Sequence, residues 1–283
     1  MIKRTLYFGN PAYLSKKDKQ IVVDQLNKDI PPQTIPIEDV AIVILDEQQI
    51  TITQGLLYEL IENNVAVISC DSTHHPIGLM MPLSSNTLQS AKFKWQIEAS
   101  VPLKKNLWQQ TVKAKITNQG MLLKSLNKKS EPLMYLAKNV SSGDSDNKEA
   151  RAAAIYWKEL FGDGFTRERY GTPPNNLLNY GYAILRAIVA RGLVSSGMLP
   201  TFGIHHRNQY NAYCLADDIM EPYRPFVDKL VIDIVGENKV YVDLNMCNYK
   251  RKTALSKLKL SDYRLKTRTC IAKTTRFHSA IQS

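Results

Sequence analysis

The spacing of apolar residues changes near residue 86, and this change constrains the fold more than any other feature of the sequence. Before it, short β-branched or aromatic runs alternate with polar, Pro, Asn and Gly breaks, a pattern typical of strands. The runs are LYFG, QIVV, TIPI, VAIVIL, ITIT and AVISC. Among them, only QGLLYELIENN has helical spacing. We therefore expect a small β-rich layer that includes one helix.

After Asn86 the apolar residues recur with a period of 3.6. The helical stretches are AKFKWQIEA, KKNLWQQTVKAKITNQGMLLKSL, EARAAAIYWKELFG and NNLLNYGYAILRAIVARGLVSSG. Ser145, Asp146 or Asn147 could cap the third helix, and Gly197 could end the fourth. The stretch MPLSSNT, residues 81–87, is typical of a linker.

These patterns together predict an α+β fold, in which a small β-rich N-terminal domain precedes a larger, mostly α-helical domain. The expected boundaries are residues 1–82 for the β-rich domain, 83–247 for the helical domain and 248–283 for a basic tail.

The cysteines and the apolar segments exclude several classes of protein. The four cysteines are far apart and form no CxxC pair, which argues against a zinc ribbon or a disulfide framework and fits a reducing cytoplasm. The start MIKR is not followed by an apolar segment, so we expect no signal peptide. The longest apolar stretch contains Arg186 and Arg191, which disfavours a membrane span. We expect a soluble cytoplasmic protein without a membrane partner.

Positive charge is concentrated at the C-terminal end. From Asn248 onward ten Lys and Arg residues accompany a single acid, Asp262, so the segment carries +9 of the chain's +11. Such a segment attracts polyanions, and Tyr249 and Tyr263 could stack on bases. The alternative is a solvated tail that keeps the protein soluble. The candidate DNA contacts in the tail are Lys250, Arg251 and Lys252.

The stretch GIHHRNQYNAYCLADDIMEPYRP, residues 203–225, gathers imidazoles and carboxylates. If its centre is helical, Asp218 and Glu221 share a face, and His206 must fold back from the preceding loop. Two carboxylates and one imidazole suit Mn²⁺ or Mg²⁺. Acids that only compensate a helix dipole are the alternative. Glu149, in the first turn of an earlier helix, is a further candidate ligand, but no spacing argument connects it to this stretch.

Four short motifs occur in an order that is more specific than any one of them. A Glu precedes a small-residue helix in EARAAAIYWKELFG, an LNYGY helix follows, then a G-x-x-H loop, and finally DDIMEPYRP. This order resembles the universal CRISPR adaptation integrase, a metal-dependent endonuclease family that inserts new spacers. The resemblance is especially close to the branch that accompanies single-protein RNA-guided effector nucleases. It covers roughly residues 149–228 and fades past about Asp233.

The resemblance assigns roles to individual residues. It implies that Glu149, His206 and Glu221 hold the metal ion and that Asp218 supports the same site. It makes Asp217 a solvated acid or a helix cap. Other residues are expected to brace the site or to contact DNA: Tyr180, Tyr182, Arg224, Arg167, Arg169 and Tyr170.

The activity implied by the resemblance is phosphoryl transfer, in which the 3′-hydroxyl of a short DNA fragment attacks a phosphodiester at the edge of a CRISPR repeat. The implied metal is Mg²⁺ or Mn²⁺. The implied partners are protospacer and repeat DNA, a second copy of the chain bound through the N-terminal domain, a small ferredoxin-like companion protein and the RNA-guided effector nuclease. Two other functions remain open: a metal-dependent nuclease or branched-DNA resolvase without integration, and a non-catalytic nucleic-acid-binding scaffold.

Overall fold

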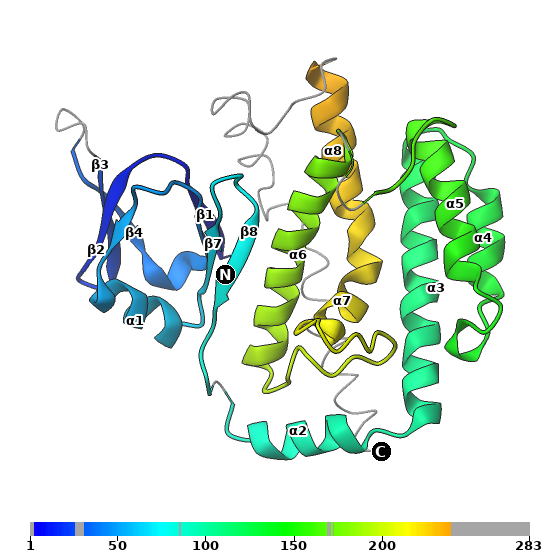
Figure 1. Cartoon of the computed structure of the whole chain (residues 1–283), viewed down its shortest axis with the longest axis horizontal. Coiled ribbons are helices and arrows are strands. Elements are labelled where there is room, and N and C mark those ends of the chain that lie inside the picture. The colour runs from blue at the N-terminus through cyan, green and yellow to red at the C-terminus, as the bar shows by residue number, and fades with distance from the viewer. Residues whose placement is uncertain (1–2, 26–30, 85, 169–170, 172, 239–283) are drawn as a thin grey trace. The chain divides into compact units, whose positions relative to one another are not determined.

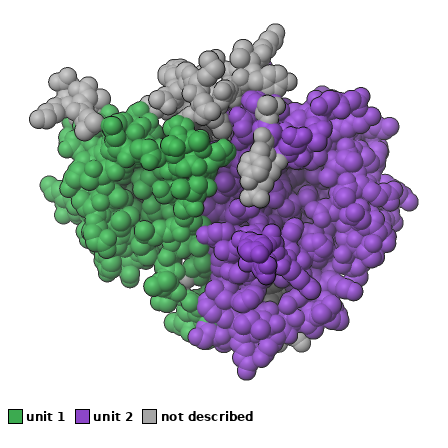
Figure 2. Space-filling view, in the orientation of Figure 1, with its two compact units in different colours: residues 1–89, 194–197, 242–276 green, residues 90–193, 198–241, 277–283 purple. Residues whose placement is uncertain are grey.

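The structure is a computed structural model, and it describes residues 3–25, 31–84, 86–168, 171 and 173–238 (Figure 1). The described residues divide into two compact units (Figure 2). The first unit comprises residues up to 89 together with 194–197, and the second comprises residues 90–193 and those from 198 onward. The α+β class predicted from the sequence is confirmed, because the strands are confined to the N-terminal part and helices form the rest.

The first unit contains two four-stranded sheets. One sheet has the order β1-β5-β7-β8, in which β1, β5 and β7 are parallel and β8 is antiparallel to β7. The other has the order β4-β3-β2-β6, with β2, β3 and β4 antiparallel. Their bounds are β1 Arg4–Phe8, β2 Ala12–Lys17, β3 Gln20–Gln25, β4 Gln33–Pro36, β5 Val40–Leu45, β6 Thr51–Ile52, β7 Ala66–Cys70 and β8 Pro76–Met80.

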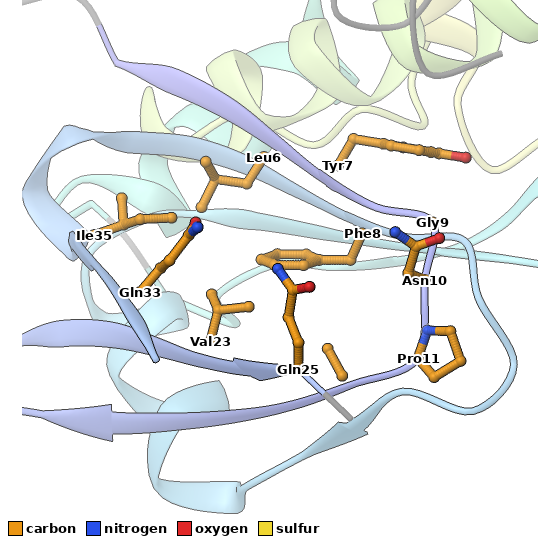
Figure 3. A pocket seen from close by; sticks show the side chains of 11 residues that line it. Leu6, Tyr7, Phe8, Gly9, Asn10, Pro11, Val23, Gln25, Gln33 and Ile35 are labelled. Atoms are coloured by element: carbon orange, nitrogen blue, oxygen red, sulfur yellow. The ribbon is translucent and has the colours of Figure 1, made fainter. Parts of the chain in front are cut away.

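The core of this unit draws on both sheets and on helix α1, Gln54–Glu62. Leu14, Val40 and Leu60 are fully buried in one cluster. A 3₁₀ turn, η1 (Ile37–Asp39), joins the two sheets. A cavity of about 240 Å³ opens beside this core, lined by β1 and by the ends of β3 and β4 (Figure 3). All six runs expected to be strands contain one, and the single expected helix is present.

The second unit is built around one long helix, α3. At 25 residues this helix is about 38 Å long. It contacts α4, α5, α7 and α8 and the two 3₁₀ turns of this unit, η2 and η3, with α4 and α5 on one side of it in Figure 1. The bounds are α2 Gln89–Glu98, α3 Val101–Ser125, α4 Glu131–Lys138, η2 Ser142–Asp144, α5 Lys148–Phe161, α6 Asn175–Ser195, α7 Cys214–Met220, η3 Glu221–Tyr223 and α8 Arg224–Asn238.

Helix α6 lies in the interior of the fold. Within the described part of the chain it alone is long and apolar enough to cross a membrane, but 61% of its most apolar window is buried inside the structure, as in the core helix of a globular protein. Gly197 follows it in the left-handed conformation, with φ of 77°, and its amide bonds back to Val194, as expected of the residue that ends a helix.

A buried carboxylate on α8 connects this helix with α5 and α6. The hydroxyls of Tyr156 on α5 and Tyr182 on α6 both donate to Asp228 on α8. Burial raises the pKa of Asp228 to about 6, although the two phenolic hydrogen bonds and the nearby arginines oppose this shift. This network fixes the relative positions of the helices that carry the candidate site.

Candidate active site

A carboxylate cap fixes the start of α5 and therefore the position of Glu149. Oδ1 of Asp144 accepts a hydrogen bond from the amide of Lys148 at 2.9 Å, and Oδ2 accepts one from the amide of Glu149 at 3.0 Å. Of the expected caps, Asn147 occupies the N-cap position, but it adopts a left-handed conformation and its side chain makes no cap bond. The capping carboxylate comes instead from Asp144 in the preceding turn. Glu149 thus sits in the first turn of a firmly anchored helix.

Glu149 and Glu221 meet at one cationic group, the ammonium of Lys115. Nζ of Lys115 lies 2.6 Å from Oε1 of Glu149 and 2.6 Å from Oε2 of Glu221. The two glutamates come from α5 and η3, and Lys115 comes from the middle of α3. The structure therefore brings together two of the expected metal-ligand acids, which are 72 positions apart in the sequence.

Lys115 is a site residue that the sequence analysis missed. It follows Trp108 and Val112 at helical spacing on the face of α3 that points inward, and only 12% of its side chain is exposed. A lysine within such an apolar stripe is the signal that could have found it, because a buried ammonium needs a negatively charged partner. Burial lowers the pKa of Lys115, but Glu221 and Glu149 outweigh this effect and raise it overall.

Glu221 is the most strongly held acid of the group. Burial opposes its charge, yet the Arg224 guanidinium and the Lys115 ammonium hold the pKa of this carboxyl at about 2. Nε of Arg224 donates to Oε1 at 2.7 Å, and the guanidinium lies 4.4 Å from the ring centroid of Tyr182. Oε2 forms an ion pair with Nζ of Lys115 at 2.6 Å and meets no other donor among the residues that the structure describes.

Asp218 organises the loop that carries His206. This fully buried carboxylate accepts the amides of Ile204 and His205 at 2.7 and 2.9 Å and contacts Nδ1 of His206 at 2.5 Å. The bond to Asp218 raises the pKa of His206. Because Nδ1 is engaged, Nε2 is the nitrogen left for a ligand.

The loop geometry also depends on Gly203, because a Cβ there would lie 2.3 Å from the carbonyl oxygen of His206. Asp217 is buried between the guanidinium of Arg186, at 2.6 Å, and the amide of Asn211, at 2.7 Å. The expectation that Asp217 is a solvated acid or a helix cap is therefore wrong. It is an internal ion-pair partner.

Across the part of the chain that the structure describes, no three His, Cys, Asp or Glu side chains are already grouped as a metal-ligand set. The chemistry of the donors nevertheless fits a divalent cation. Two carboxylates already face one cation position, and Oε2 of Glu221 has the Lys115 ammonium as its one partner among the described residues. The charge of Glu221 also contributes to the raised pKa of His206, so the imidazole lies near the same position. Carboxylate oxygens with one imidazole suit Mn²⁺ and Mg²⁺.

The family model for CRISPR associated protein Cas1 matches residues 6–256 of the chain. The chain belongs to the Cas1 family. The match includes the β-rich unit and extends beyond Asp233, where the resemblance was expected to fade. Among curated Cas1 relatives, the CRISPR-associated endonuclease Cas1 of Neisseria meningitidis serogroup C (strain 8013) is 38% identical over 246 residues, which are 86% of this chain and 80% of the relative.

Solved structures show the same fold. A casposase bound to its integration product superposes with a TM-score of 0.67 at 21% identity, over 85% of this chain and 74% of the casposase. A chain of a Cas6-RT-Cas1–Cas2 complex gives a TM-score of 0.64 at 23% identity, over 85% of this Cas1-family chain and 29% of that chain.

The expected DNA contacts of this Cas1-family chain are only partly within the described residues. The guanidinium of Arg167 is held inside its unit, 2.6 Å from Oδ1 of Asn179 and 5.3 Å from the ring centroid of Tyr182. Arg224 is bound to Glu221, as given above. Both therefore brace the site in this structure, and their contacts with DNA stay predictions. Five candidates lie outside the described residues: Arg169, Tyr170, Lys250, Arg251 and Lys252.

Proposed function

We propose that this chain is a divalent-metal-dependent DNA endonuclease and integrase that inserts short DNA fragments into a CRISPR array. The observation that carries the proposal is the convergence of Glu149 and Glu221, from two separate helical segments, on the single cation position that Lys115 takes in the structure. Membership of the Cas1 family supports it, as does the fold shared with a casposase solved with an integration product.

Glu149, Glu221 and the Nε2 of His206 would hold the metal ion, and either Mg²⁺ or Mn²⁺ suits this donor set. When bound, such an ion acts as a Lewis acid on the phosphodiester oxygens and lowers the pKa of the attacking hydroxyl. The remaining work belongs to the side chains around it. Arg224 fixes one oxygen of Glu221 and leaves the other directed at the cation position, and Asp218 keeps the His206 ring in one orientation.

The proposed substrates are a short fragment with a 3′-hydroxyl and the repeat edge that this hydroxyl attacks. Exchange of one phosphodiester for another needs no nucleotide cofactor, which agrees with the lack of a GxxxxGK[ST] motif in the sequence. The proposed partners are a second copy of this chain, bound through the β-rich unit, and a small ferredoxin-like companion protein. A structural neighbour solved within a Cas1–Cas2 complex supports such an assembly, and the RNA-guided effector nuclease is a further proposed partner.

A strand-joining assay tests this proposal. The protein, its companion, Mn²⁺ and a labelled duplex are incubated with a supercoiled plasmid that carries the repeat. Covalent attachment of the label at the repeat edges is the expected result. Nicking without attachment would instead indicate a nuclease or resolvase, and DNA binding without either reaction would indicate a scaffold.

A matched pair of variants assigns the chemistry to the site. Glu221→Gln keeps the size of the side chain but removes its charge, so joining should fall by at least about a hundredfold while binding of the duplex persists. Glu98→Gln removes an exposed glutamate of the same unit and should join like the wild type. Equal joining by the two variants would remove Glu221 from the mechanism.

A further inference from the structure

A cavity of about 310 Å³ lies beside the candidate active site, in the second unit. It opens between the first two turns of α3 and the loop that carries the histidines. Its lining includes Lys104 and Lys105 from α3 and His205 and Arg207 from the loop. A volume of this order is enough for a small ligand or for one unit of a polymer.

The cavity has a positive charge that is not neutralised within the described structure. Lys104, Lys105 and Arg207 form no ion pair with any described carboxylate. The N-terminus of α3 adds the positive end of a 25-residue helix to the same wall. Three cations and a helix N-terminus around one cavity favour the binding of an anion, and a nucleic acid carries its anionic groups as phosphates.

One wall of the cavity is aromatic. The ring of His205 stacks on Trp108 with centroids 4.1 Å apart and an interplanar angle of 4°. Trp108 is 2% exposed, so it is a fixed support, whereas His205 is exposed. Trp108 therefore covers one face of the imidazole and holds the ring at the cavity, where a sugar or base can pack against it.

The cavity shares structural elements with both expected ligand segments. Trp108 also contacts His206 edge-on, with ring centroids 5.8 Å apart. The stem of Lys105 packs on Gly143, which also lines the cavity, has a φ of 68° and is a position where a Cβ would lie 3.1 Å from Cγ of the lysine. Gly143 directly precedes Asp144, the cap of the helix that carries Glu149. A ligand in the cavity would thus contact residues next to His206 and next to the anchor of Glu149.

From this arrangement we propose that the cavity is a nucleotide subsite. It binds one phosphate of the DNA strand that enters the active site, next to the phosphodiester that reacts, with Lys105 and Arg207 as its principal ligands and the His205 ring as a stacking surface. The identity of the ligand rests on the proposed function, because DNA is the substrate there. The subsite positions the strand and takes no part in bond breaking.

The test compares two double variants with the same change of charge. Lys105→Gln with Arg207→Gln removes two cations from the cavity, whereas Lys124→Gln with Lys129→Gln removes two exposed cations at the far end of α3. Lys124 is 19 residues from Lys105, which is about 29 Å along the helix. Fluorescence anisotropy with a labelled duplex that has a 3′ single-stranded end gives the dissociation constant in EDTA over a range of salt concentrations. Thermal unfolding of each variant checks that it is folded.

The cavity variant should bind roughly tenfold more weakly than the control variant, the equivalent of one charge-assisted hydrogen bond. Its salt dependence should also be shallower by about 0.7 in log–log slope, as for one lost phosphate contact on a single strand. Equal binding and equal slopes in the two variants would overturn the proposal.

The strand-joining assay separates the two proposals. If the wild type joins DNA and the cavity variant binds and joins like the control, the subsite is wrong and the function stands. If the cavity variant binds weakly and the wild type joins nothing in Mn²⁺, the subsite stands and the function is wrong. If the wild type binds no DNA, both proposals are wrong.

Discussion

Lys115 is the residue whose removal should change the candidate site most. Its ammonium is the single positive group that both Glu149 and Glu221 contact among the described residues. Lys115→Met keeps the stem and removes the charge. In this variant Glu221 still pairs with Arg224, and the side chain of Glu149 is 24% exposed to solvent. We therefore expect the unfolding free energy to fall by about 3 kcal/mol, the low end of the range for breaking a buried ion pair. Urea unfolding in EDTA measures it.

Mn²⁺ provides the second readout for Lys115→Met. A divalent cation has to displace the ammonium in the wild type but not in the variant, so the variant should gain more unfolding free energy from saturating Mn²⁺. The control is Lys229→Met, which breaks an exposed ion pair with Asp233. It should lower the unfolding free energy by less than about 1 kcal/mol, and Mn²⁺ should stabilise it no more than it stabilises the wild type. If the two variants behave alike, Lys115 does not occupy the cation position.

The raised pKa of Asp228 predicts how the stability of the protein depends on pH. Its pKa is about 6 in the folded chain against an ordinary 3.8, so between these values the folded state keeps a proton that the unfolded chain has lost. The free energy of unfolding therefore falls as pH rises from about 4 to about 6, by up to about 3 kcal/mol from this group. Asp228→Asn should lack this part of the decline in urea unfolding at pH 4 and pH 7. Asp233→Asn, exposed on the same helix, should follow the wild-type profile.

At the residue scale, the sequence could identify the acids and the histidine of the site but not the basic residues that pair with the acids. Glu149, His206 and Glu221 were found through the order of motifs, because the spacing alone did not connect Glu149 with the rest. Lys115 looks like any surface lysine until the register of α3 is known. Asp217 looked solvated because its partner, Arg186, comes from a different helix, and periodicity within one segment carries no information on such a contact.

Two glycines of α6 make a matched test of helix packing. At Gly181 a Cβ would lie 2.4 Å from Cγ1 of Val227 on α8, so Gly181→Ala should force the helices apart and cost about 1–3 kcal/mol. At Gly192 a Cβ would meet nothing within 4 Å, and Gly192→Ala should stabilise the helix by up to about 1 kcal/mol. Chemical denaturation measures both changes. Similar values for the two variants would show that α6 and α8 do not approach closely at Gly181.

Three of the elements that the sequence pattern did not reveal, β2, β8 and α4, have weak local signals. β2, with the sequence AYLSKK, ends in two lysines, and β8, PIGLM, contains both Pro and Gly, which are poor strand formers. Both become strands because they pair with β3 and β7. Helix α4 was missed because it has only eight residues, too few for periodicity to stand out, and its packing on α3 and α5 stabilises it.

At the scale of the whole molecule, the division into a β-rich part and a helical part could be predicted from the change of apolar spacing near residue 86. Strand spacing and helix spacing bury apolar residues in different ways. The convergence of α3, α5 and η3 on one site did not follow, since contacts over 34 and 106 positions depend on how helices pack. The resemblance supplied that link. The proposed roles of the basic tail concern residues outside those that the structure describes.

The most direct test of the account is a titration of the metal-free protein with Mn²⁺, followed by the electron paramagnetic resonance signal of the free ion. The account predicts one bound Mn²⁺ per chain in the wild type and in Glu98→Gln, and loss of that binding in Glu221→Gln, whose side chain no longer carries a charge at the cation position. Undiminished Mn²⁺ binding by Glu221→Gln would contradict the claim that Glu149, His206 and Glu221 together hold the metal.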